Sequence, residues 1–191
     1  MDDASRQEDA ALWWVDHARA VSELATGIAT RDLGKARLAK ESFWDLSVRW
    51  TELTCHPLAG WLMAEHLSLV SAFADASAAR SKRQMDALLS ALLANADEQA
   101  RLHSSDSVRF PAQEFRDGMA KHVARIGSYV EGMMWWDTAA LGKAWKQVEA
   151  SRDDLARIWM KAFSRKPAGA DESARASSKP RQRPPRPGPV A

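Results

Sequence analysis

The chain carries one sequence pattern three times: HARAVSELATG at residues 17–27, HLSLVSAFADA at residues 66–76 and HVARIGSYVEG at residues 122–132. In each copy the histidine is followed at +4 by Val or Ile, at +7 by Leu, Phe or Tyr, and at +10 by Gly or Ala. A fourth, looser copy starts at Asn95. Residues spaced by three and four positions share one face of a helix. The pattern therefore predicts helices that each place a polar ring or amide on an apolar stripe.

Helix-breaking residues are scarce in the first 163 positions, where Pro57 and Pro111 are the only prolines. No stretch alternates apolar and polar residues as a strand would. The apolar periodicity predicts helices over about residues 8–29, 32–54, 58–78 and 81–102. A fifth helix is expected after Pro111, and a sixth is expected to follow residue 137 and to end near residue 163. Because the connections are short, we expect an all-α, up-and-down bundle of four to six helices.

Composition divides the chain into three regions. We expect a disordered N-terminus over residues 1–7, a helical bundle domain over residues 8–163, and a disordered, basic, Pro-rich tail over residues 164–191. The tail contains seven basic and two acidic residues, so its net charge is +5. Because the whole chain has a net charge of +2, residues 1–163 have a net charge of −3. The tail therefore suggests contact with an anionic partner or surface, whereas the acidic balance of the bundle disfavours nucleic-acid binding by that domain.

The sequence lacks the marks of a secreted or membrane protein. Its single cysteine, Cys55, excludes an intrachain disulfide, and its first residues are acidic where a secretory signal would be basic and then apolar. No apolar run approaches the roughly 20 residues that span a bilayer. We therefore expect a cytoplasmic protein without a membrane span, and homo-oligomerisation stays open.

The candidate site consists of His17, His66, His122 and Asn95. Each lies near the middle of its predicted helix, and helix midpoints stay level in a bundle whichever way the helices run. Three neutral imidazoles from separate helices match the ligands of a transition metal such as Zn, Fe, Cu or Ni, with Asn95 as a further ligand or an orienting group. The sequence therefore predicts a metal ion at a buried layer of histidines.

Several alternatives remain open. The histidines and Asn95 could form a purely structural polar layer. Alternatively, the bundle could be a scaffold or adaptor whose basic tail contacts an anionic partner or surface. A phasin-like coat is disfavoured, because coat helices have no reason to centre a histidine in each apolar face. The nine tryptophans predict thick core packing or, alternatively, a Trp-lined cavity for haem or an aromatic ligand. The sequence contains no Gly-rich phosphate loop, no nucleophile elbow and no His-Glu-x-x-His motif, so we assign no reaction.

Short motifs around these positions resemble a family of uncharacterised bacterial helical-bundle proteins. They are LANADE at residues 93–98, the run Glu65-His66-Leu67, and FP at residues 110–111 followed by MAKH at residues 119–122. The resemblance covers about residues 10–163 and implies that His17, His66, Asn95 and His122 are family positions. The resemblance implies no particular activity for this chain. The architecture is also similar to hemerythrin-type bundles, although the histidines are too few for a di-iron centre.

Overall fold

Six long helices make up almost all of the structure, which is a computed structural model that describes residues 3–106, 110–134 and 138–163. The helices are α1 (Asp3–Thr30), α2 (Leu33–Thr54), α3 (Pro57–Ala78), α4 (Lys82–Asp106), α5 (Ala112–Met134) and α6 (Thr138–Phe163). No strand occurs among these residues. The predicted all-α, up-and-down bundle is therefore confirmed.

Local sequence signals set the corners between the first helices. Asp32 caps α2 by accepting a hydrogen bond of 2.9 Å from the backbone N–H of Lys35. Pro57 occupies the first turn of α3, where its missing N–H has no intrahelical partner to lose. Arg31 directly follows α1 and Cys55 directly follows α2. Both adopt the left-handed backbone conformation that ends many helices.

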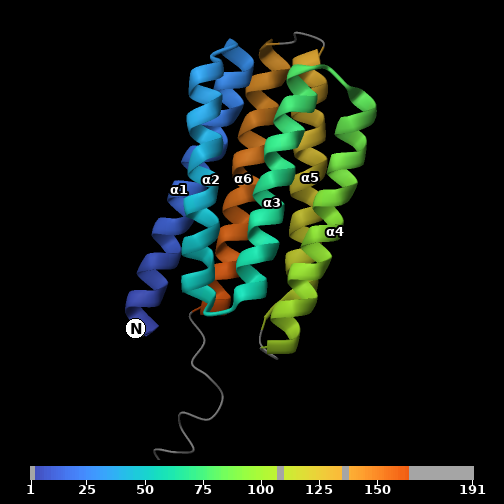
Figure 1. The fold of residues 1–191 in the computed structure, drawn as a ribbon. Coiled ribbons are helices and arrows are strands. Elements are labelled where there is room, and N and C mark those ends of the chain that lie inside the picture. The colour runs from blue at the N-terminus through green and yellow to red at the C-terminus, as the bar shows by residue number, and fades with distance from the viewer. Residues whose placement is uncertain (1–2, 107–109, 135–137, 164–191) are drawn as a thin grey trace, which may run out of the picture.

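The helices form a closed ring in chain order. Figure 1 shows α1, α3 and α5 running in one direction and α2, α4 and α6 in the other, and each helix packs against the next. The ring closes where α6 packs against α1, and α1 also touches α3 across the interior. Side chains from α1, α3 and α5 can therefore approach one another at the same level of the bundle.

Two helix ends differ from the sequence-based expectation. The first helix begins at Asp3 rather than near Glu8, so residues 3–7, predicted as disordered, are helical. The fourth helix runs to Asp106, past the expected end at Leu102, because the ring of His103 packs on Phe110 and Trp159 with centroid separations of 5.3 and 4.7 Å. The predicted tail, residues 164–191, lies outside the described residues.

Aromatic side chains fill the half of the bundle that contains the start of α1. The indole of Trp13 lies 4.5 Å from that of Trp50, which lies 4.8 Å from that of Trp159 (ring centroids). All three are buried, and Trp13 Nε1 donates a hydrogen bond of 2.7 Å to the carbonyl of Leu46. These tryptophans therefore pack against one another in tilted and edge-to-face arrangements in the core, as expected.

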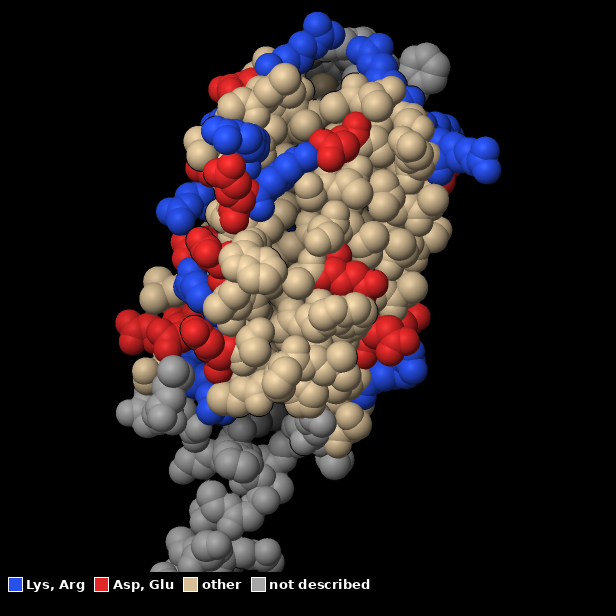
Figure 2. All heavy atoms as spheres, in the orientation of Figure 1, with Lys and Arg blue, Asp and Glu red and all other residues tan. Residues whose placement is uncertain are grey.

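Two other tryptophans lie on the surface, against the expectation of core packing. Trp44 on α2 is 71% exposed and Trp61 on α3 is 61% exposed. Figure 2 shows that charged side chains are sparse over the centre of the face that α2, α3 and α4 present. Among the described helices, none combines the length and apolarity that crossing a bilayer requires.

Gly27 permits a close approach of α1 to α2, and its substitution tests this packing. A Cβ at Gly27 would lie 2.7 Å from the backbone nitrogen of Ala36 and 3.0 Å from its Cα, so α2 would have to move. We expect Gly27→Ala to lower the free energy of unfolding by about 1–3 kcal/mol. Gly142→Ala is the matched control, because no atom lies within 4 Å of its Cβ, and it should raise that free energy by about 0.5–1 kcal/mol. Urea denaturation measures both, and a Gly27→Ala protein as stable as the wild type would contradict the close approach.

Candidate functional site

The structure brings the three predicted histidines to one level of the bundle. The rings of His17 on α1 and His66 on α3 are 6.4 Å apart between centroids and tilted by 34°. His122 on α5 is close enough for its charge to lower the pKa of His17, and a charge on His66 lowers the pKa of both other rings. We call His17, His66 and His122 the imidazole layer.

Burial keeps the imidazole layer uncharged. Loss of solvation lowers the pKa of His17 from 6.5 to about 3, with smaller contributions from His66, His122 and Arg152. The same cause lowers the pKa of His66 and of His122 to about 4. At neutral pH all three rings are therefore unprotonated, and each has one nitrogen lone pair available to a ligand.

Two nitrogens of the layer have no hydrogen-bond partner among the described residues. They are Nδ1 of His17 and Nδ1 of His66, and both are buried. The ring of His17 is instead held by aromatic contacts, because it stacks on Trp13 at 5.1 Å and meets the edge of Trp14 at 5.4 Å. A buried polar atom without a partner costs on the order of 1–3 kcal/mol, so this pair requires an explanation.

His122 differs because its ring is hydrogen-bonded to a serine of α6. Its Nδ1 lies 2.9 Å from Oγ of Ser151. The single hydroxyl proton of Ser151 goes to a carbonyl of its own helix, that of Val148 at 2.8 Å or of Gln147 at 3.0 Å. When the hydroxyl donates to one of these carbonyls, its oxygen accepts from Nδ1–H of His122, and Nε2 is then the nitrogen with a lone pair.

Asn95 belongs to a hydrogen-bonded network between α3 and α4. Its amide nitrogen donates to the carbonyl of Leu62 at 3.0 Å and to a carboxylate oxygen of Glu65 at 2.8 Å, and its amide oxygen accepts from Gln99 at 2.7 Å. Leu62 precedes His66 by one helical turn. Asn95 therefore positions the helix that carries His66, and its own oxygen is already engaged.

Apart from the histidines themselves, the charged side chains that lower the pKa values of the imidazole layer are arginines. Arg152 lowers the pKa of His17 and His122, and its own partner is the carboxylate of Asp153 at 2.9 Å. The carboxylate that precedes His17, Asp16, pairs with Arg49 at 2.6 Å. Within the described residues, no three side chains among His, Cys, Asp and Glu converge tightly enough to enclose a metal ion in this conformation.

Sequence reasoning missed Ser151 and Arg152. Both follow Val148, a buried residue of α6, by three and four residues, so they continue its helical face. That spacing is the sequence signal that could have placed both residues on the buried face of the last helix. Their contact with the imidazole layer depends on α6 packing between α5 and α1, which the sequence does not specify.

Comparison with known proteins gave no match: no family model fits the chain, and no curated protein and no solved structure is significantly similar to it. The resemblance to bacterial helical-bundle proteins of unknown activity stays a prediction.

The lowered pKa values make stability depend on pH. The folded protein keeps the three rings neutral down to about pH 4, whereas in the unfolded chain they bind protons near pH 6.5. The full stability is therefore present above pH 6.5 and falls as the pH drops toward 4.

We expect the free energy of unfolding to decrease by about 3 kcal/mol or more over this range. Urea titrations at pH 7.5, 6.0 and 5.0 measure it. His66→Gln should reduce the slope by about one proton, and an unchanged slope would contradict the buried neutral ring.

Proposed function

We propose that this protein binds a transition metal ion at the imidazole layer. The observation that carries the proposal is the pair of buried, unpartnered Nδ1 atoms on His17 and His66. Both rings are neutral at physiological pH, the state that a metal requires of a histidine ligand. A bound ion would satisfy both nitrogens and offset the cost of burying them without a hydrogen bond.

The separation of the two rings suits a shared ion. An imidazole nitrogen lies about 1.2 Å from its ring centre and about 2.1 Å from a bound zinc ion, so two rings on one ion have centres at most about 6.6 Å apart. The observed 6.4 Å between His17 and His66 falls inside this limit. It corresponds to an angle of about 150° at the ion, so the two rings would have to move closer together to bind a tetrahedral zinc ion, whose ligand angles are about 110°.

His122 is the third ligand in this proposal. Its Nε2 carries the lone pair because Ser151 holds the proton on Nδ1. A hydrogen bond of this kind orients metal-ligating histidines in many proteins. Ser151 is therefore a positioning residue for His122, and Asn95 has a comparable role for the helix of His66.

The donor set and its surroundings favour zinc or copper over the other metals. Neutral imidazoles suit both ions, and no carboxylate is among the proposed ligands to balance a higher charge. The guanidinium of Arg152 lowers the pKa of His17 and His122, so it also opposes a highly charged ion. A monovalent copper ion would meet the least repulsion.

The other sequence-based function, an adaptor whose basic tail contacts an anionic partner, stays a prediction because residues 164–191 lie outside the described residues. No contact in the described helices favours it over the metal site.

Metal binding is tested by equilibrium dialysis of the apoprotein against Zn²⁺, and against Cu⁺ under anaerobic conditions, followed by elemental analysis. We expect one ion per chain for at least one metal. Removing a ligand by His17→Ala or His66→Ala should weaken binding at least about 100-fold, and Ser151→Ala should weaken it about tenfold.

His56→Ala is the matched control, because His56 lies at the corner between α2 and α3, away from the imidazole layer. It should bind metal as the wild type does. Absence of binding for both metals, or equal binding by the His66→Ala and wild-type proteins, would overturn the proposal.

A further inference from the structure

A small apolar cavity of about 90 Å³ lies beside the imidazole layer. It is bounded by α1, α3, α4, α5 and α6, and its walls are formed almost wholly by aliphatic and aromatic side chains, such as Leu24, Phe73 and Ile126. Of the tryptophans that the structure describes, only Trp145 lines it. His122 also lines it. The cavity therefore places an apolar space against one ring of the imidazole layer.

The lining of the cavity favours an apolar occupant over water. The hydroxyl of Ser77 already donates to the carbonyl of Phe73 at 2.7 Å, and Nδ1 of His122 lies 2.9 Å from Oγ of Ser151. None of the described residues that line the cavity carries a charge at neutral pH. A buried water needs about two to four polar partners, whereas apolar cavities stay dry.

The volume of the cavity limits its occupant to a molecule of a few atoms. One water molecule takes about 30 Å³ of the liquid, and a diatomic gas needs roughly one to two times that space. Apolar cavities of about 150 Å³ bind xenon or benzene. A cavity of about 90 Å³ therefore has room for one small gas molecule.

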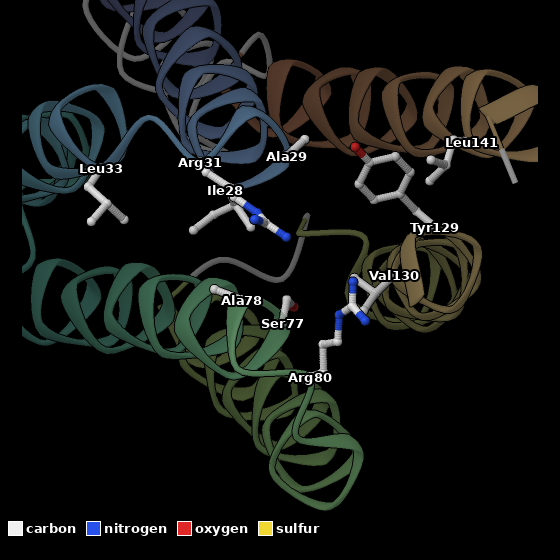
Figure 3. Close-up of a pocket in the computed structure, with 10 residues that line it drawn as sticks. All are labelled: Ile28, Ala29, Arg31, Leu33, Ser77, Ala78, Arg80, Tyr129, Val130 and Leu141. Atoms are coloured by element: carbon white, nitrogen blue, oxygen red, sulfur yellow. The ribbon is translucent and has the colours of Figure 1, made fainter. Parts of the chain in front are cut away.

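The cavity borders a second hollow, of about 210 Å³, at the end of the bundle where α1 and α3 finish. The residues that line both spaces are Ile28, Ser77, Tyr129 and Val130. Figure 3 shows them around the hollow, with Ile28 on α1, Ser77 on α3 and the other two on α5. The hollow is therefore the side from which a small molecule reaches the cavity.

From this geometry we infer that the cavity binds a small, uncharged, apolar gas molecule of the size of dioxygen, carbon monoxide or nitric oxide, and holds it against the ring of His122. Dispersion contacts with the surrounding side chains supply the attraction. Burial lowers the pKa of His122 to about 4, so the ring is neutral and does not draw water into the cavity.

Gas binding does not depend on the proposed metal site, so it is tested on the apoprotein in EDTA at pH 7.5. Carbon-13 methyl spectra under xenon pressure should show one saturable set of shifts at Leu24 and Ile126. Dioxygen, which is paramagnetic, should broaden these methyls and the ring protons of His122. The methyls of Leu155 are the internal control, because Leu155 is as deeply buried as Leu24 but does not line the cavity. The Kd for dioxygen should be on the order of 10 mM, the limit for two heavy atoms.

Filling the cavity should remove the site. Ala74 lines it on α3, and Ala74→Leu should reduce the affinity for xenon at least about tenfold. Ala72→Leu is the matched control, because Ala72 lies on the same helix but lines a surface groove between α2 and α3, and it should respond as the wild type does.

Circular dichroism and thermal unfolding show whether Ala74→Leu is folded. If it is not, Ala74→Val takes its place, with at least about a threefold loss expected. Three results would each overturn the inference: cavity methyls that respond to xenon and dioxygen no more than those of Leu155, a ring of His122 that does not respond to dioxygen, or wild-type affinity for xenon in the folded Ala74 variant.

Discussion

The burial of three imidazoles at the middle of the bundle is the constraint on which the rest of the structure depends. Burial holds His17, His66 and His122 neutral, with pKa values of about 3, 4 and 4. Each ring therefore needs a partner from its surroundings. Trp13 stacks on His17 and Ser151 bonds to His122, so α1 and α6 supply two of these partners. The remaining nitrogens are the reason to place a ligand in the layer.

Packing on the two sides of the layer differs. On one side, the buried rings of Trp13, Trp50 and Trp159 pack against one another between the helices. On the other side, aliphatic and aromatic residues line an apolar cavity that reaches His122. The rigid aromatic half fixes the helices that carry the histidines, and the open half gives a ligand access to them. This asymmetry connects the fold to the proposed metal site.

Much of this architecture could be predicted from periodicity, because an apolar residue at every third or fourth position specifies a helix locally. The level placement of the histidines also follows from their mid-helix positions. The polar partners do not, since the hydrogen bonds of Asn95 to Leu62 and of His122 to Ser151 depend on which helices are neighbours. The exposure of Trp44 has the same origin, because a tryptophan count does not say which face of a helix meets the core.

The state of the three rings tests the central claim most directly. Nitrogen-15 NMR of the folded protein with labelled histidine, between pH 7.5 and 5.0, reports the protonation and tautomer of each ring. The account predicts that His17, His66 and His122 stay neutral throughout, that His122 carries its proton on Nδ1, and that Zn²⁺ or Cu⁺ shifts the resonances of all three. Rings that titrate near pH 6.5 in the folded protein and do not respond to metal would contradict it.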